Sequence, residues 1–271
     1  MSLRDEFATT VAPGPHCDLG RAALTIARIA YPDLDAGPYL ARLDALAASA
    51  RPRLPADVPP AEAGLALASY LFRDLGFRGN ADDYYDPRNS FLNDVLERRT
   101  GIPISLSVLL IEIGTRLGLA AEGVGFPGHF LVRIGSVLFD PFYGGRPVGP
   151  EELLTRYRAL SGMPAEMLPP DALRPADRPA ILARMLRNLT RVYLDRREHA
   201  CALAAADLLL VLEPDAPAEV RLRGLLYEQL ECTAAALADF RRYLELHPEA
   251  PDADTIRERI VNLARATVTL H

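Results

Sequence analysis

The sequence predicts an α+β domain that is preceded by helices and followed by an all-α helical region. Three observations lead to this prediction. Apolar residues recur at helical spacing through residues 18–76, and the period changes to two after Gly118, as in strands. From about residue 180 the spacing is helical again and contains an internal repeat. We therefore expect an N-terminal helical region (1–85) packed on a core domain (86–160), followed by a helical array (180–271).

The N-terminal region is expected to be helical apart from one loop. Residues 18–50 have apolar side chains three and four apart on both sides of Pro32, which predicts two amphipathic helices. The proline-rich stretch that follows, RPRLPADVPPAEAG, is typical of a loop. A helical pattern resumes over residues 61–76 and ends at Gly76, a suitable C-cap.

The middle region combines two helices with strands. NSFLNDVLERRTG has one apolar face and offers Asn89 or Ser90 as its N-cap. SLSVLLIEIGTRLG is apolar on most sides, so we expect a central helix buried against a sheet. Its Glu112 precedes Arg116 by four residues, the order that favours an ion pair. The segments LAAEGVGF, HFLVRI and VLFDPF then alternate as strands do.

HFLVRIGSVLFDPF predicts a hairpin that brings a histidine and an aspartate together. If Gly135 and Ser136 form a two-residue turn, Ile134 faces Val137, and His129 and Asp140 share one side of the hairpin. A three-residue turn would break this parity. With the two-residue turn, Asp140 can accept a hydrogen bond from one imidazole nitrogen of His129, as the acid does in nucleophile-His-Asp catalysis. The other reading is structural: a satisfied core histidine, and an aspartate that shapes the turn before proline.

The C-terminal region contains a repeat. ALAAADLLLVLEP (202–214) and ALADFRRYLELHP (236–248) align at an offset of 34 with six identities in thirteen, and Tyr193 and Tyr227 have the same offset. This period, with small residues where paired helices cross and a proline after the second helix, resembles the tetratricopeptide repeat. We expect about two repeats and a last helix near 254–268; the alternative is an ordinary helical bundle.

Composition excludes several kinds of site and partner. The chain has no lysine, which excludes both a GxxxxGK[ST] phosphate loop and a lysine Schiff base. A net charge of −6 with scattered arginines argues against nucleic acid. Cys17, Cys201 and Cys232 lack metal-ligand spacing and pair poorly as disulfides, so we expect no metal and no cofactor. Without a long apolar run or a signal peptide, the sequence predicts a soluble cytoplasmic protein that does not bind membranes.

The order of these elements resembles a known family. An apolar helix after GIP, a strand with histidine and a strand with Asp-Pro are similar to the core of the transglutaminase-like superfamily, which is related to the papain-type fold. The longer match, NSFLNDVLERRTGIPISLSVLLIEIGTRLGLAAEGVGFPGHFLVR and LFDPFYGG followed by tetratricopeptide-like helices, resembles the bacterial SirB-type family (SirB-one, N-terminal domain). The resemblance extends from about Ala27 to Arg259.

The resemblance implies a site from which the usual nucleophile is missing. Active transglutaminase-like enzymes have a cysteine at the start of the core helix, about where this chain has Pro103 to Ser105. Ser105 is the nearest hydroxyl and Ser107 the next, and a serine would need His129 as its general base. Ser105 could equally cap the helix or bind a ligand.

Two functions follow from this pattern. The first is a non-catalytic transglutaminase-like protein, with serine in place of the cysteine, that acts as a protein-interaction or regulatory module and binds a protein or peptide through its helical repeats. The second is a serine-dependent hydrolase or acyl transferase that uses Ser105, His129 and Asp140.

Overall fold

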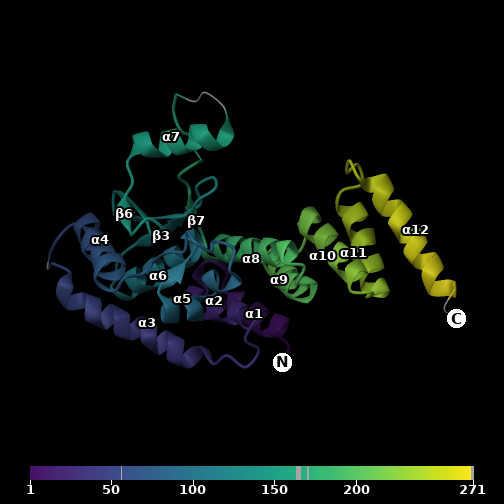
Figure 1. Ribbon diagram of the computed structural model, residues 1–271, viewed down its shortest axis with the longest axis horizontal. Helices are drawn as coiled ribbons and strands as arrows, with labels where there is room; N and C mark the ends of the chain where they lie inside the picture. Colours follow the sequence, from purple (N-terminus) through teal and green to yellow (C-terminus); the bar gives the residue numbers. More distant parts are fainter. Residues whose placement is uncertain (56, 163–165, 170, 270–271) are drawn as a thin grey trace. The chain divides into compact units, whose positions relative to one another are not determined.

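The computed structural model describes residues 1–55, 57–162, 166–169 and 171–269 (Figure 1). Ala56, in the predicted proline-rich loop, and the last two residues of the predicted helical array lie outside this description. The chain divides into two compact units, which we name the sheet unit (Thr10–Met185) and the repeat unit (Met1–Thr9 with Leu186–His271). The fold is α+β with an all-α region after it, as the sequence predicts.

The other helices of the sheet unit that precede the sheet pack around α6 (Pro103–Arg116). They are α2 (Leu19–Ala27), α3 (Ala36–Ala50), α4 (Pro60–Ala68) and α5 (Leu92–Arg98), and α4 continues as a π-helix over Ser69–Asp74. The first helix of the chain is α1 (Leu3–Val11). Residues 103–114 of α6 are all buried, as expected of the central helix. The predicted ion pair is present: Arg116 Nη1 lies 2.5 Å from Glu112 Oε2.

The predicted hairpin has the expected register. The sheet has the strand order β6-β5-β4-β3-β7, and its neighbouring strands are antiparallel. Ile134 pairs with Val137 across a turn at Gly135 and Ser136, where Gly135 has φ +59°. The bounds are β3 (Ala121–Val124), β4 (Leu131–Ile134), β5 (Val137–Asp140), β6 (Arg146–Pro147) and β7 (Pro175–Ala176). The sequence did not predict β6 and β7, nor the separate parallel pair β1 (Arg78–Gly79) and β2 (Thr100–Gly101).

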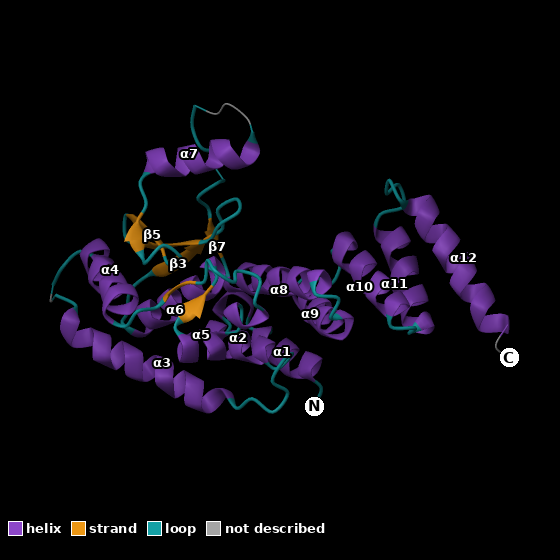
Figure 2. Ribbon diagram, viewed as in Figure 1, coloured by secondary structure: helices purple, strands orange, loops and turns teal. Residues whose placement is uncertain are grey.

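Different helices cover the two faces of this sheet. On one face, Gly64 of α4 packs against Ile134 and Phe139, and Gly114 of α6 packs against Ala121. The other face is covered by α7 (Pro150–Ser161), whose Leu153 joins Val124 and Leu131 in a buried apolar cluster. Figure 2 shows α7 and α6 on opposite sides of the sheet. Since side chains alternate along a strand, Asp140 is on the α7 face, unlike its neighbour Phe139.

The repeat unit has the predicted period. Its helices are α1 up to Thr9, the end of α8 (Arg178–Asp195), α9 (His199–Leu212), α10 (Pro217–Gln229), α11 (Thr233–Leu246) and α12 (Ala253–Thr269). Both ends of α11 lie 34 residues after the corresponding ends of α9. Where α10 meets α11, Gly224 packs on Phe240: a Cβ at Gly224 would lie 2.9 Å from that ring. The small residue therefore permits the close crossing of the two helices.

One predicted helix start is wrong. The N-cap of α5 is Phe91 rather than Asn89 or Ser90, because residues 87–89 form a short 3-10 turn before the helix. The side chain of Asn89 instead holds the preceding loop: its Nδ2 donates to the carbonyl of Asp83 at 2.7 Å.

Candidate functional site

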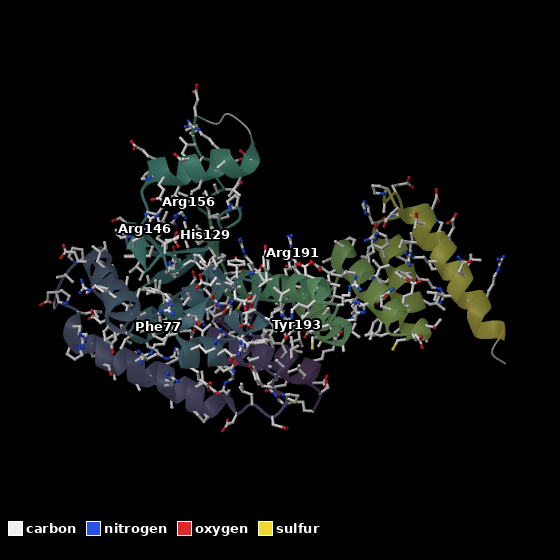
Figure 3. All side chains as sticks on the ribbon, viewed as in Figure 1. Phe77, His129, Arg146, Arg156, Arg191 and Tyr193 are labelled. Carbon is white, nitrogen blue, oxygen red and sulfur yellow. The ribbon has the colours of Figure 1, made fainter. Side chains whose placement is uncertain are left out.

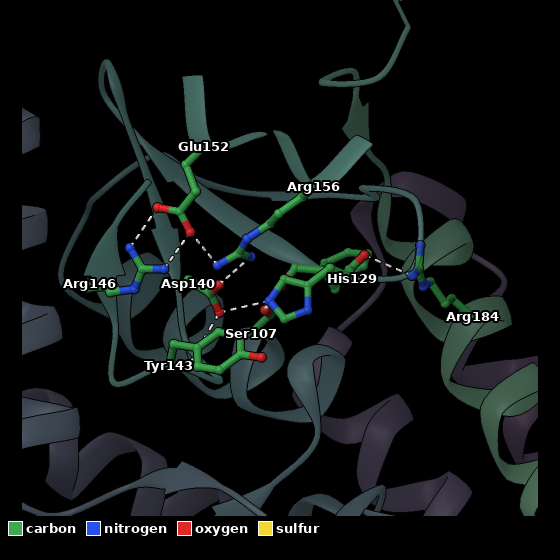
Figure 4. A network of polar contacts seen from close by, with 9 residues as sticks. Ser107, His129, Asp140, Tyr143, Arg146, Glu152, Arg156 and Arg184 are labelled. Atoms are coloured by element: carbon green, nitrogen blue, oxygen red, sulfur yellow. Dashed lines mark hydrogen bonds and ion pairs between the residues drawn. The ribbon is translucent and has the colours of Figure 1, made fainter. Parts of the chain in front are cut away.

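His129 lies in a short turn between β3 and β4. Its N–H donates to the carbonyl of Phe126 at 2.9 Å, and Gly128 supplies a left-handed residue within the turn (φ +65°). Arg184 of α8 fixes the same turn from the backbone side, donating to the carbonyls of Phe126 at 3.3 Å and His129 at 2.8 Å. Burial lowers the pKa of the Arg184 guanidinium. The turn is thus held by a cation that leaves the imidazole ring free for other contacts (Figure 4).

The structure brings His129 and Asp140 into direct contact. His129 Nε2 lies 2.8 Å from Asp140 Oδ1, at the end of β5, and Asp140 is fully buried. The backbone N–H of Tyr143 donates to the same oxygen at 3.3 Å. Because an ionised carboxylate only accepts, the bond puts a proton on Nε2, and in the neutral ring Nδ1 remains as an acceptor. The pair therefore has the orientation that a general base requires.

Asp140 also has a second, cationic partner. Arg156 of α7 donates from Nη1 to Asp140 Oδ2 at 2.8 Å. Burial alone would raise the pKa of Asp140, but the bonds and charges of His129 and Arg156 hold it below the ordinary value. One carboxylate oxygen of Asp140 thus faces the imidazole and the other faces the guanidinium, so His129 shares the aspartate with Arg156.

The network continues outward along α7. Glu152 Oε1 accepts from Arg156 Nη2 at 2.6 Å, and Glu152 Oε2 accepts from Arg146 Nη1 at 2.8 Å. The bonds from Arg146 and the charge of Arg156 lower the pKa of Glu152 to about 2. Figure 3 shows His129, Arg146 and Arg156 gathered between the sheet and α7. This series of alternating acidic and basic side chains extends from the buried Asp140 to the surface.

Aromatic rings surround the imidazole. The Tyr143 ring is stacked on His129 with centroids 5.9 Å apart, and Phe142 meets it edge-on at 6.2 Å. Tyr84 packs on Phe142, and Tyr85 packs on Tyr84. Tyr143 is 56% exposed and Tyr85 59% exposed, so these two rings form the outer edge of the site. Arg156 lies over the Tyr143 ring at 5.3 Å.

Ser105 contacts the backbone of its own helix start. Its hydroxyl donates to the carbonyl of Asn89 at 2.5 Å and accepts from the N–H of Ile102 at 3.1 Å, and the residue is 1% exposed. The sequence allowed Ser105 as an N-cap; the structure places it at N3 of α6, where its hydroxyl accepts from the Ile102 N–H, which also donates to the carbonyl of Asn89 at 3.3 Å. In the described part of the chain no hydrogen bond joins Ser105 to His129 or Asp140.

Ser107 and the three cysteines lie in different parts of the chain. The Ser107 hydroxyl is buried and lies 3.5 Å from the carbonyl of Phe130. Cys17 is buried in the sheet unit, and burial raises the pKa of its thiol. Cys201 and Cys232 belong to the repeat unit. Among the described residues, no group of three or more His, Cys, Asp or Glu side chains is placed to hold a metal ion.

Sequence reasoning missed the part of the site that α7 contributes. The segment PEELLTRYRALS does carry a helix signal: proline at its first position, Glu151 and Glu152 in the first turn, and Glu152 four residues before Arg156. This signal predicts the helix and its own ion pair. It does not reveal that Arg156 reaches Asp140, because that contact depends on how α7 packs on the sheet.

Comparison with known proteins gives matches over nearly the whole chain. Residues 37–187 match the family described as the transglutaminase-like superfamily, and residues 189–261 match the tetratricopeptide repeat. A UPF0162 protein of Xylella fastidiosa (strain Temecula1) is 44% identical over 92% of this chain and 91% of its own. Protein SirB1 of Salmonella typhimurium is 30% identical over 95% of this chain and 96% of its own. UPF0162 protein YchA of Escherichia coli K12 is 30% identical, also over 95% of this chain and 96% of its own. No solved structure matches significantly.

Proposed function

Because the chain belongs to the transglutaminase-like superfamily, and within it to the family of SirB1 and the UPF0162 proteins, we propose that it is a non-catalytic member that acts as a protein-interaction or regulatory module. In this proposal serine stands where active relatives have the catalytic cysteine. The repeat unit binds a protein or peptide, and the sheet unit serves as its platform.

The environment of Ser105 is the observation that carries this proposal. A catalytic hydroxyl needs a general base within hydrogen-bond reach and an approach for the substrate. The Ser105 hydroxyl is buried, and its contacts are with the backbone of Asn89 and Ile102. Moreover, α6 packs on the sheet face opposite the one on which Asp140 lies. Both facts favour a structural role for this serine.

The second function keeps one observation in its favour. A serine-dependent hydrolase or acyl transferase needs a histidine oriented by an acid, and His129 and Asp140 have that relation at 2.8 Å. The sharing of Asp140 with Arg156 weighs against it, because the arginine charge already compensates the carboxylate that would stabilise an imidazolium.

A covalent probe separates the two functions. The full chain and its Ser105→Ala variant are treated with a fluorophosphonate, and adducts are counted by intact-protein mass spectrometry. A genuine serine hydrolase serves as the positive control. We expect no adduct that depends on Ser105. An adduct on the wild-type chain that is absent from Ser105→Ala would establish a reactive serine and exclude the non-catalytic function.

The repeat unit supports the interaction part of the proposal. Tetratricopeptide helices expose surfaces on which other proteins can dock. Val261 of α12 is 47% exposed and lines a surface pocket with Arg257 and Asn262. A single exposed apolar side chain is common on protein surfaces, so the support comes from its place in a surface pocket of a repeat helix.

The interaction is tested with a matched pair of tagged full-length chains, wild type and Val261→Asp, incubated with an extract of the source organism. A protein recovered in stoichiometric amount by the wild type and lost with Val261→Asp supports the proposal. Equal recovery by both chains, or no stoichiometric protein with either, counts against binding at this surface. Circular dichroism of both chains checks that the substitution has left the fold intact.

A further inference from the structure

Arg184 is a partly buried cation for which the sheet unit provides no acid. Burial lowers the pKa of its guanidinium, and among the described residues no carboxylate pairs with it. Arg156 differs in this respect, because Asp140 and Glu152 both bind it. A charge that is partly removed from water is favourable chiefly when an opposite charge lies against it. Arg184 is therefore placed to bind an anion from outside the chain.

Part of the Arg184 guanidinium is available to a ligand. Nη2 donates to the carbonyls of Phe126 and His129, at 3.3 and 2.8 Å. Nε and Nη1 have no hydrogen-bond partner among the described residues, yet neither belongs to the fully buried side-chain atoms that lack a partner. Both nitrogens are therefore reached by solvent. Their N–H groups can donate to an anion while Nη2 continues to hold the turn.

The Tyr84 hydroxyl lies near this guanidinium. Burial raises the pKa of the phenol, and the charges of Tyr85 and Tyr143 act in the same direction, whereas the charge of Arg184 acts against them. Tyr84 is 38% exposed, and its hydroxyl has no partner among the described residues. Asn89 holds the loop that carries this ring, since its Nδ2 donates to the Tyr84 carbonyl at 3.3 Å. A second donor is thus fixed close to the cation.

Large exposed apolar side chains gather around these donors. Half of the eight that the described chain exposes lie here: Tyr84, Tyr85, Tyr143 and Leu160. Phe142 connects the tyrosine rings, with its centroid 5.8 Å from that of Tyr84 and 5.2 Å from that of Tyr143. Leu160 packs on the turn that carries His129, because a Cβ at Gly128 would lie 3.1 Å from its Cδ1. Several exposed apolar side chains in one patch indicate an interaction surface.

The charges around the imidazole favour a carboxylate over a phosphate. Two acids of the network, Asp140 and Glu152, pair with two arginines of the same network. Arg184 adds a single unbalanced positive charge, and Figure 4 shows it on the side of the imidazole opposite Asp140. One guanidinium balances one carboxylate, whereas a phosphate group carries close to two charges at neutral pH.

From these observations we infer that this surface binds the C-terminal carboxylate of a protein or peptide whose last residue is apolar. The carboxylate lies against Arg184 and accepts from the Tyr84 hydroxyl. The last side chain, which branches from the same carbon as the carboxylate, packs on the exposed rings of Tyr84 and Tyr143. Because the surface is open, the preceding residues can extend across it, as they do where other proteins capture a chain end. The site belongs to the sheet unit, so it goes beyond the binding proposed for the repeat unit.

Titration calorimetry of the full chain with short peptides tests the chemistry of the site. Three peptides begin with acetyl-Gly-Ser-Gly-Ser and end in Ala-Phe as the free acid, Ala-Phe as the amide, or Ala-Ser as the free acid. We expect the Ala-Phe acid to bind about tenfold or more tightly than either of the others, because it alone has both the carboxylate and the ring. Equal binding of the amide or of the Ala-Ser acid overturns the inference, as does a lack of binding by the Ala-Phe acid at millimolar concentration.

Two further probes distinguish a chain end from other carboxylates. Acetyl-Gly-Ser-Gly-Ser-Asp-Phe amide carries its carboxylate on a side chain, and 3-phenylpropionate is a free acid without a peptide. Binding about tenfold weaker than that of the Ala-Phe acid supports the inference for each probe. If either probe binds as tightly as the Ala-Phe acid, an internal acidic residue or a small acid suffices, and the inference is overturned.

Variants locate the site. Arg184→Gln removes the cation and should weaken binding of the Ala-Phe acid about tenfold or more. Tyr84→Phe removes only a hydroxyl and should weaken it about fivefold, so this variant remains informative if the loss of the Arg184 contacts prevents folding. The matched control is Arg191→Gln, which removes the same charge from an exposed position of α8 and should leave binding unchanged. Unchanged binding with Tyr84→Phe, or an equal loss with Arg191→Gln, overturns the inference.

The Val261→Asp variant separates this site from the binding proposed for the repeat unit. It should bind the Ala-Phe acid as the wild type does, because Val261 belongs to the repeat unit. Binding at the wild-type level supports the inference even if the extract experiment fails. A tenfold loss with Val261→Asp would place the peptide on the repeat unit and overturn the inference.

Discussion

Arg156 donates to one oxygen of Asp140 at 2.8 Å while His129 lies 2.8 Å from the other. The carboxylate is fully buried, and the arginine comes from α7, whose contact with Asp140 the sequence pattern did not reveal. The three residues therefore form an ionic network around a buried carboxylate and not an isolated histidine–aspartate pair. The contribution of this network to the free energy of unfolding can be measured without knowing any ligand.

Removing Arg156 should be costly. Arg156→Ala leaves the buried Asp140 without its cation, and we expect the free energy of unfolding to fall by about 2–4 kcal/mol. The control is Arg146→Ala, which breaks a more exposed ion pair with Glu152 and should cost less than about 1 kcal/mol. Urea denaturation at neutral pH measures both. Similar losses for the two variants would show that Asp140 does not depend on Arg156.

Stability should depend on pH through Asp140. Its pKa in the folded chain is lowered, so its ionised form stabilises the fold above the ordinary aspartate pKa of about 4. That contribution is lost as the pH falls through the lowered value. We expect the difference in unfolding free energy between wild type and Asp140→Asn to shrink as the pH is decreased from 7 toward 2. A difference that stays constant over this range would contradict the lowered pKa.

Ser105→Ala should destabilise the start of α6. The substitution removes the bond to the Asn89 carbonyl and the acceptor for the Ile102 N–H, and we expect a loss of about 1–2 kcal/mol. Ser107→Ala is the matched control, because its hydroxyl makes one long contact of 3.5 Å and should cost clearly less. Thermal and urea unfolding of the two variants provide the comparison. An equal cost would mean that the Ser105 contacts do not stabilise the helix.

The crossing of α10 and α11 should require a small residue at position 224. Gly224→Ala places a Cβ 2.9 Å from the Phe240 ring, and we expect this clash to outweigh the better helix propensity of alanine by about 1 kcal/mol. Adding Phe240→Leu should remove the clash, so the two substitutions together should show a favourable coupling energy. Additive effects in this double-mutant cycle would argue against a close crossing.

The sequence predicted local features well and long-range contacts less well. The two-residue turn at Gly135 and Ser136 followed from residue types and alternation, and it determined the register of the hairpin. The α5 N-cap was wrong because a 3-10 turn at 87–89 displaced the helix start. The strands β1, β2, β6 and β7 are two residues long, too short to produce a period that a sequence can reveal.

The tetratricopeptide period and the Glu112–Arg116 pair were also determined by the sequence alone, because each depends on spacing within one helix or one repeat. The tertiary structure decided what the candidate site contains. It brought Arg156 to Asp140 across 16 residues of chain, and it brought Ser105 to the carbonyl of Asn89, also 16 residues away. The physical reason is that side-chain periodicity specifies which face of an element is buried, whereas the partner of a buried polar group depends on which element packs there.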